Sequence, residues 1–274
     1  MPFMRAARRP LPPAQTEVYT SRSMSGKPAD PHTTDFGYRR VPAAAKPGLV
    51  RAVFDSVAPR YDLMNDLMSL GIHRAWKRIL LTALDPRPNR RLLDLAAGTG
   101  DIGLAWRAAN GGPALLTDIN ASMLAIARDR AIERGLIAGL DVVVGDAERL
   151  PISDGRFDRV SIAFGLRNCT DKSTVLTQAR RVLRPGGRFF CLEFSRMHVA
   201  AFEPVYDAWS FHVLPRLGGL IAGDSGSYRY LVESIRTFPD QQHLAAMMEA
   251  AGFARVSVRN LSGGIAAIHS GWRL

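Results

Sequence analysis

Cysteine is scarce in this chain of 274 residues, which carries Cys169 and Cys191 and no others. Two cysteines without CxxC spacing or a neighbouring histidine pair cannot build a disulfide framework or a four-ligand zinc site. We therefore expect no metal centre, and we expect the chain to work in a reducing compartment.

Long apolar runs are also missing. A membrane-spanning helix needs about 18 or more consecutive apolar residues, and the best stretch, residues 211–222, is interrupted by Arg216. Basic residues outnumber acidic ones by 36 to 25, giving a net charge of +11. The chain nevertheless has no Lys/Arg block, zinc-finger spacing or aromatic-glycine run typical of RNA binding. We expect neither a membrane span nor a nucleic-acid partner.

Proline and small polar residues dominate the first 48 residues, which show no apolar periodicity. Residues 1–48 are therefore predicted to be a disordered leader. Their first part is rich in arginine and poor in acidic residues. Residues 1–23 are thus either a transit segment or the product of a misassigned start, with Met24 opening the protein. Residues 49–274 have the length and apolar content of one α/β domain with appendages.

Hydrophobic periodicity divides this domain into parts. Residues 49–88 have helical spacing broken at Pro59 and Gly71 and are predicted to be an N-terminal helical cap. Residues 195–239 are rich in aromatic residues and are predicted to be a helical insert on the substrate side, before the last helix. Elsewhere strands alternate with helices, which is typical of βαβ units.

We therefore predict an α/β fold with a doubly wound, mostly parallel, Rossmann-like sheet of seven strands. The strands are expected near residues 91–96, 113–118, 140–144, 157–164, 187–194, 253–260 and 264–270. Helices are expected near residues 101–110, 121–134, 172–183 and 240–251.

A glycine turn follows the first predicted strand of the sheet. Gly98 and Gly100 let the backbone approach a ligand closely at the start of a helix. With Asp118 ending the next strand, 20 residues after Gly98, the pattern fits a dinucleotide fingerprint, and a tight turn without a ligand is the bland alternative. Asp94, inside the end of the first strand, distinguishes between the two candidate ligands, a nicotinamide dinucleotide and S-adenosylmethionine. A nicotinamide enzyme has little use for this carboxylate, whereas S-adenosylmethionine offers it an ammonium and a sulfonium.

Two further acidic side chains follow the next strands. Asp118 is placed to accept hydrogen bonds from ribose hydroxyls. Asp146 is placed to accept a proton from an adenine amino group. Each of them alone could simply cap a turn, but carboxylates at three successive strand ends favour one bound ligand, S-adenosylmethionine. Arg167 and Asn168 follow the fourth strand, where the crevice at the carboxyl ends of the strands would place the reacting methyl group.

Several long motifs carry a resemblance to a known family. They are residues 54–77 (FDSVAPRYDLMNDLMSLGIHRAWK), 164–168 (FGLRN), 206–215 (YDAWSFHVLP) and 227–235 (SYRYLVESI). Together with the glycine turn, and with the turn at 183–187 (LRPGG) that precedes the fifth strand in class I methyltransferases, they closely resemble the ubiquinone/menaquinone biosynthesis C-methyltransferase family (UbiE). The similarity runs from about residue 48 to the C-terminus.

The resemblance implies transfer of a methyl group from S-adenosylmethionine to a ring carbon of a polyprenyl benzoquinol (2-methoxy-6-polyprenyl-1,4-benzoquinol), of demethylmenaquinol, or of both. It assigns Thr99, Asp118 and the pair Asp146–Ala147 to the cofactor. Ala163 is also expected to line the cofactor site, where the family frequently has serine and the alanine offers no hydroxyl contact.

The chemistry then requires an activated ring. Ionising a phenolic hydroxyl with a pKa of about 10 at pH 7 costs about 4 kcal/mol. We expect Arg167 to stabilise the phenolate, since a guanidinium stays protonated and cannot act as the base. Asn168 and Tyr61 are expected to orient the ring oxygens, and His212 is the expected proton acceptor.

Two other functions fit the same fold: an RNA methyltransferase, suggested by the basic balance, and a non-catalytic subunit that binds S-adenosylmethionine. The missing RNA-binding module argues against the first and the intact cofactor motif against the second. We expect a peripheral contact with a membrane surface, at the inner membrane of a bacterium from the cytoplasm or in the mitochondrial matrix of a eukaryote. A homo-oligomer or a quinone-biosynthesis complex are the expected assemblies.

Overall fold

The computed structural model describes residues 32–57, 66, 69, 71–196 and 225–274. Its strands are β1 (Thr33–Phe36), β2 (Arg39–Pro42), β3 (Leu92–Leu95), β4 (Ala114–Asp118), β5 (Leu140–Val144), β6 (Phe157–Ala163), β7 (Leu183–Phe194), β8 (Ala254–Leu261) and β9 (Ala266–Trp272). Its α-helices are α1 (Lys46–Val57), α3 (His73–Leu84), α4 (Asp101–Ala108), α5 (Ala121–Glu133), α6 (Lys172–Val182), α9 (Ser225–Thr237) and α10 (Gln241–Ala250). Short 3-10 helices are η1 (Ala43–Ala45), η3 (Leu166–Asn168) and η6 (Ser262–Gly264).

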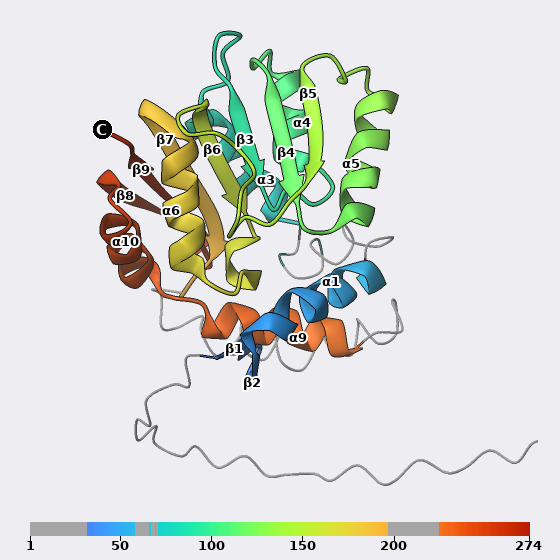
Figure 1. Cartoon of the computed structure of the whole chain (residues 1–274), viewed down its shortest axis with the longest axis vertical. Coiled ribbons are helices and arrows are strands. Elements are labelled where there is room, and N and C mark those ends of the chain that lie inside the picture. Colours follow the sequence, from blue (N-terminus) through green and yellow to red (C-terminus); the bar gives the residue numbers. More distant parts are fainter. Residues whose placement is uncertain (1–31, 58–65, 67–68, 70, 197–224) are drawn as a thin grey trace, which may run out of the picture. The chain divides into compact units, whose positions relative to one another are not determined.

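A seven-stranded sheet forms the centre of the described domain, in the order β5-β4-β3-β6-β7-β9-β8 (Figure 1). Strands β3 to β7 run parallel, and β9 is antiparallel to both of its neighbours, β7 and β8. All four residues of β3 are buried, as expected for a central strand covered on both faces. The predicted fold class, with its mostly parallel doubly wound sheet, is confirmed.

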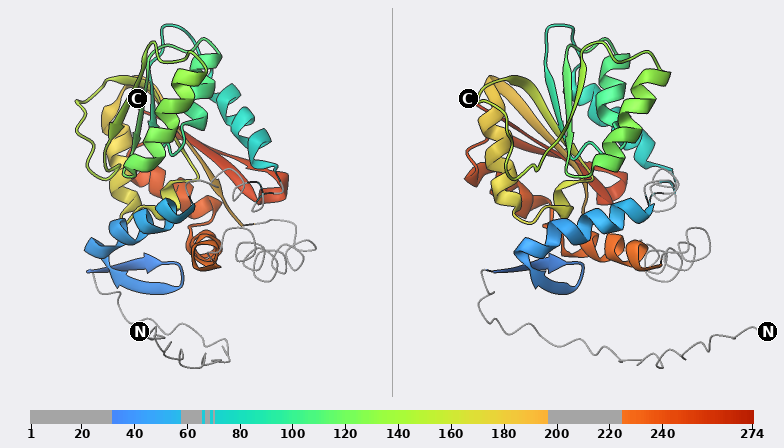
Figure 2. Two further views of the ribbon diagram at one scale, coloured as in Figure 1. Left: turned by 90° about the vertical axis from the view of Figure 1, so that its right-hand side faces the viewer. Right: turned by 45° about the vertical axis from the view of Figure 1, so that its right-hand side comes forward.

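Helices cover both faces of the sheet (Figure 2). On one face, α3, α4 and α5 bury side chains such as Leu80 and Trp106 against Leu116 of β4. On the other face, α6 and α10 bury Leu176 and Leu244 against the opposite side of the sheet. These two apolar layers fix the directions of the strands, and with them the places where the loops at the strand ends emerge.

Side-chain caps begin several of these helices. Asn120, Asp171 and Asp240 each accept a hydrogen bond from the backbone N–H three residues on, at the starts of α5, α6 and α10. Such caps satisfy N–H groups that have no partner inside the helix. A polar residue at the start of a helix can therefore be explained by capping alone, without a ligand.

The β1–β2 hairpin, α1 and α9 lie across the carboxyl ends of the parallel strands (Figure 1). Helices α1 and α9 pack together, and the Phe36 ring stacks on Tyr230 with centroids 4.2 Å apart. The prediction of a disordered leader through residue 48 is therefore wrong for residues 33–48. Hairpin contacts between distant segments, which local periodicity does not report, stabilise this part of the chain. Residues 1–31 lie outside the described residues.

The predicted cap and insert are described in part. Helix α1 ends before Pro59, and α3 begins two residues after Gly71, whose φ is +77°. Of the insert predicted at 195–239, α9 is helical, whereas residues 197–224 lie outside the described residues. No helix in the described part of the chain is both long enough and apolar enough to cross a bilayer.

Candidate active site

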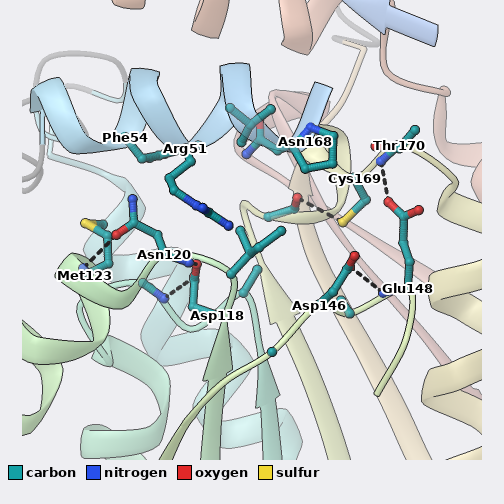
Figure 3. A pocket seen from close by; sticks show the side chains of 18 of the residues that line it. Arg51, Phe54, Asp118, Asn120, Met123, Asp146, Glu148, Asn168, Cys169 and Thr170 are labelled. Atoms are coloured by element: carbon teal, nitrogen blue, oxygen red, sulfur yellow. Dashed lines mark hydrogen bonds between the residues drawn. The ribbon is translucent and has the colours of Figure 1, made fainter. Parts of the chain in front are cut away.

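A pocket of about 770 Å³, including its open mouth, lies at the carboxyl ends of β3, β4, β5 and β6 (Figure 3). It is lined from the loops after these strands and from α1 above. Lining residues include Val50, Arg51, Phe54, Ala96, Gly98, Asp118, Asn120, Met123, Asp146, Ala147, Glu148, Phe164, Asn168, Cys169 and Thr170. Sequence reasoning placed a ligand at this edge of the sheet, and the structure has a pocket there.

The turn after β3 has an unusual backbone. Ala96, Gly98 and Gly100 all have positive φ, of 48°, 55° and 83°. Gly100 begins α4, and a Cβ there would come within 2.9 Å of the Ala127 Cβ. Only glycine tolerates both this conformation and this contact. The glycine pattern therefore brings backbone N–H groups close to the pocket.

Asp118, at the end of β4, is held by two backbone groups. Its Oδ2 accepts a hydrogen bond from Gly98 N and its Oδ1 one from Asn120 N, both at 2.8 Å. Burial raises the pKa of the carboxyl, and these backbone donors counteract part of that effect. Each carboxylate oxygen can still accept another hydrogen bond. Asp118 thus presents fixed acceptors to the pocket, as a ribose diol requires.

The loop after β5 carries Asp146 and Ala147, which both line the pocket. Asp146 Oδ1 accepts from Glu148 N at 2.9 Å. Glu148 Oε1 accepts from Thr170 N at 2.6 Å, so the loops after β5 and β6 are joined. Within the described part of the chain, Asp146 Oδ2 has no hydrogen bond and remains an acceptor.

Asp94 lies in a smaller neighbouring pocket that shares Ala96 with the main one. Thr99 and Ala163 line the same small pocket, together with Lys77 and Asp101. Asp94 is 2% exposed and accepts from Ser161 Oγ at 2.7 Å. Burial raises the pKa of this carboxyl to about 7. Seven of the eight sequence-predicted cofactor residues therefore line two adjoining pockets: Gly98, Asp118, Asp146 and Ala147 the main one, and Asp94, Thr99 and Ala163 the smaller one. The eighth, Gly100, lines neither pocket and lies at the start of α4.

The turn after β6 holds Arg167, which we expected to stabilise a phenolate, against a buried carboxylate. The Arg167 side chain is 3% exposed and forms a salt bridge with Glu193 Oε2 at 2.8 Å. The same Nη1 atom donates to Phe164 O at 2.6 Å. Phe164 has a φ of 58° and lines the main pocket, whereas Arg167 does not. The charge of Arg167 is therefore compensated by Glu193, and its side chain is bonded to the backbone of a pocket-lining residue, Phe164.

Asn168 does face the main pocket, as expected. Its Oδ1 accepts a hydrogen bond from the Tyr230 hydroxyl at 3.1 Å. Tyr61 and His212, the other two residues predicted to act on the substrate, lie outside the described residues.

Helix α1 supplies residues that the sequence analysis did not assign. Arg51 and Phe54 reach from α1 toward Asp118 and Asn120 (Figure 3). Asp55 Oδ1 accepts from Asn120 Nδ2 at 2.9 Å, which ties α1 to the start of α5. Nothing in the local pattern marks Arg51, since its place over the pocket depends on how α1 packs on the domain. In the part of the chain that the structure describes, no group of three His, Cys, Asp or Glu residues is arranged to hold a metal ion.

Solved structures share this architecture. A methyltransferase dependent on S-adenosylmethionine from Thermotoga maritima has a TM-score of 0.57 at 19% identity, covering 82% of this chain and 100% of that one. Phosphoethanolamine N-methyltransferase 2 of Haemonchus contortus, solved with S-adenosyl-L-methionine, has a TM-score of 0.53 at 18% identity, covering 69% of this chain and 39% of that one. At these identities the likeness establishes the fold.

Sequence relatives are much closer. The ubiquinone/menaquinone biosynthesis C-methyltransferase UbiE of Acidiphilium cryptum is 65% identical, over 88% of this chain and 97% of the relative. The protein of the same name in Methylobacterium nodulans is 56% identical, over 90% of this chain and 99% of the relative. Residues 41–273 match the ubiE/COQ5 methyltransferase family. With this match, this identity and a methyltransferase fold around the pocket, the chain belongs to the ubiE/COQ5 methyltransferase family.

Proposed function

We propose that this enzyme transfers a methyl group from S-adenosylmethionine to a ring carbon of a polyprenyl benzoquinol, of demethylmenaquinol, or of both. The observation that carries the proposal is the 65% identity with a relative named for that C-methylation, across 97% of the relative's length. The pocket at the carboxyl ends of the strands supports it, because crevices at that edge hold the ligands of open α/β sheets.

The donor set fits S-adenosylmethionine. Asp118 would hold the ribose hydroxyls with the lone pairs that Gly98 and Asn120 leave available. Asp146 Oδ2 would accept from the adenine amino group, with Ala147 beside the ring. Asp94, paired with Ser161, would face the positively charged methionine end in the smaller pocket. Arg51 and Phe54 would cover the bound molecule from α1.

When bound, S-adenosylmethionine supplies an electrophilic methyl group on a sulfonium. The chain must then align the acceptor ring and make its carbon nucleophilic. Asn168 fits the first task. Its Oδ1 accepts a hydrogen bond from Tyr230, which fixes the orientation of the amide and would leave both Nδ2 hydrogens to donate to a substrate. A donor at that place favours a ring oxygen that bears negative charge.

Three other residues are proposed to take part in the reaction in different ways. Arg167 is proposed to position the Phe164–Asn168 turn through Glu193, instead of contacting the phenolate. Tyr61 is proposed to orient the second ring oxygen and His212 to take the phenolic proton.

We further propose that the enzyme works at an anionic membrane surface, because its acceptor carries an isoprenoid tail that resides in the bilayer. The net charge of +11 favours such a surface. We also propose that the enzyme forms a homo-oligomer or a complex with other quinone-biosynthesis proteins.

The test is an acceptor competition. Purified protein with methyl-labelled S-adenosylmethionine should label a chemically reduced polyprenyl benzoquinol or demethylmenaquinol presented in anionic vesicles, and should leave total RNA unlabelled. Asp118→Asn is the loss-of-function control, and Asp141→Asn, on an exposed side chain of β5, is the matched control. Label in RNA, or bound cofactor without label in any acceptor, would replace this proposal with one of the two alternative functions.

A further inference from the structure

A second cavity, of about 250 Å³ including the open space at its mouth, borders the η3 turn at Arg167. It is enclosed by the β1–β2 hairpin, the start of α1, η3, the start of α6 and helix α9. Its lining includes Lys46, Arg167, Lys172, Asp35 and Tyr230. Three cations and one carboxylate thus meet at a cavity that the methyl-transfer reaction does not use.

Lys46 is the most buried of these cations. The residue is 2% exposed, and its Nζ donates one hydrogen bond, to Cys169 O at 3.0 Å. An ammonium has three donors. Within the described residues no carboxylate oxygen lies within salt-bridge distance of Lys46. A buried charge without a partner is costly, so the cavity beside Lys46 is where a counter-charge would act.

The other two cations add to this imbalance. Lys172, at the start of α6, makes no hydrogen bond or ion pair within the described part of the chain. Arg167 forms its salt bridge with Glu193, but its Nε is buried and has no partner there. Both side chains border the cavity. An atom placed there would find donors from three separate elements of the fold.

Asp35 and Glu148 offset the Lys46 charge only in part, because both act on it electrostatically but neither lies within salt-bridge distance of it. The Asp35 side chain is 51% exposed, and its Oδ1 is paired with Arg40 at 2.9 Å, on the hairpin surface. Glu193 is occupied by Arg167 and by the backbone N–H of Arg167 and Phe194. The cavity therefore keeps a positive excess from Lys46 and Lys172.

We propose that this cavity is a binding site for a small free anion of about the size of chloride, held by Lys46 with Lys172, beside the Arg167 side chain. Burial, followed by the nearby Lys172 charge, lowers the pKa of Lys46 to about 8, while Cys169, Asp35 and Glu148 act in the opposite direction without cancelling the shift. Anion binding therefore weakens above that pH, where Lys46 loses its proton. Occupancy also matters for the main pocket, because Lys46 holds the Cys169 carbonyl between two pocket residues, Asn168 and Thr170.

The experiment measures anion binding directly, with no quinol present. Thermal unfolding and isothermal calorimetry are run near pH 7 at constant ionic strength, with sodium gluconate replaced stepwise by chloride in one arm and by phosphate in the other. We expect a saturable rise in Tm with one site per chain in the chloride arm. An effect in chloride alone restricts the site to a halide-sized ion, and an effect in phosphate alone would contradict the proposed size.

The variants locate the site. Lys46→Met should weaken binding more than tenfold, and Lys172→Met by several-fold. Arg134→Met, which removes an exposed cation at the end of α5, should leave binding unchanged. If Lys46→Met does not fold, Lys172→Met carries the same test, because its side chain makes no contact that the fold requires. A Tm that rises without saturation, or equal binding in all variants, would overturn the proposal.

Discussion

The Tyr230 hydroxyl and the Asn168 side-chain carbonyl lie 3.1 Å apart, in a hydrogen bond that joins α9 to the η3 turn. Burial raises the pKa of Tyr230, so the hydroxyl keeps its proton and stays a donor. This bond fixes which end of the Asn168 amide faces the pocket.

Removing that hydroxyl should therefore affect turnover. Tyr230→Phe keeps the ring that stacks on Phe36 and loses a hydrogen bond worth about 1 kcal/mol. We expect kcat to fall roughly fivefold with an unchanged Kd for S-adenosylmethionine, measured by calorimetry. Tyr38→Phe, on an exposed tyrosine, is the matched control. Equal kcat in both variants would show that Asn168 needs no orientation.

Asp118 should govern cofactor affinity. Asp118→Ala removes a charged acceptor from the ribose site, and we expect binding of S-adenosylmethionine to weaken by about 1.5–3 kcal/mol. Calorimetry against Asp141→Ala, an exposed carboxylate on β5, separates this loss from a general charge effect. Unchanged affinity would remove Asp118 from the ribose contact.

The Arg167–Glu193 pair should appear first in stability. Arg167→Gln leaves Glu193 buried without its cation, which costs about 3–5 kcal/mol in buried pairs. We expect this loss in urea unfolding, and a smaller one when Glu193→Gln is added, because no charge then stays uncompensated. If Arg167→Gln instead keeps its stability and loses only turnover, with partial rescue at higher pH, the guanidinium acts on the phenolate after all.

Asp94 should make stability depend on pH. Its pKa is raised from 3.8 to about 7 in the folded state, so the folded chain binds this proton more tightly. The stabilisation from Asp94 is complete below the unfolded pKa and is lost as the pH rises through about 7. Asp94→Asn keeps an oxygen that can accept the hydrogen bond from Ser161. Because asparagine does not titrate, the variant does not lose stability in this way as the pH rises.

The measurement for Asp94 is a difference. Unfolding free energies of the variant and the wild type, taken from about pH 4 to pH 8, should diverge in favour of the variant. Burial lowers the pKa of His73 to about 4, so its contribution to stability rises with pH where that of Asp94 falls. Because His73 is present in both proteins, this contribution cancels in the difference. A constant difference across this range would mean that Asp94 is charged in the folded protein.

Gly100 should tolerate no side chain. Gly100→Ala places a Cβ at a φ of +83° and 2.9 Å from the Ala127 Cβ, so we expect a loss of at least 1–3 kcal/mol. Gly48→Ala is the matched control. It lies in α1 with nothing within 4 Å of the new Cβ, and should stabilise the protein by about 0.5–1 kcal/mol. Equal stability of the two variants would contradict the observed turn.

Local patterns predicted the sheet well because apolar runs and glycine turns are recorded in consecutive residues. Strand β5, for example, spans the predicted 140–144. The positions of Asp94, Asp118 and Asp146 at or just after the carboxyl ends of β3, β4 and β5 were predictable for the same reason. Charge pairing between residues that are distant in the sequence could not be predicted in this way. Glu193 lies in β7, 26 residues along the chain from Arg167 in η3, and Arg51 reaches the pocket only because α1 packs across the sheet edge. The β1–β2 hairpin was missed because its partners, such as Tyr230, are far along the chain.

Strand β9 runs against its parallel neighbours, so the chain ends at the edge of the sheet opposite the pocket (Figure 1). Leu274 is 68% exposed there. An affinity tag or a linker to a solid support, attached at this end, would hold the protein with its pocket directed away from the support. Binding of vesicles or of bulky quinols could then be measured on immobilised protein without obstruction at the pocket.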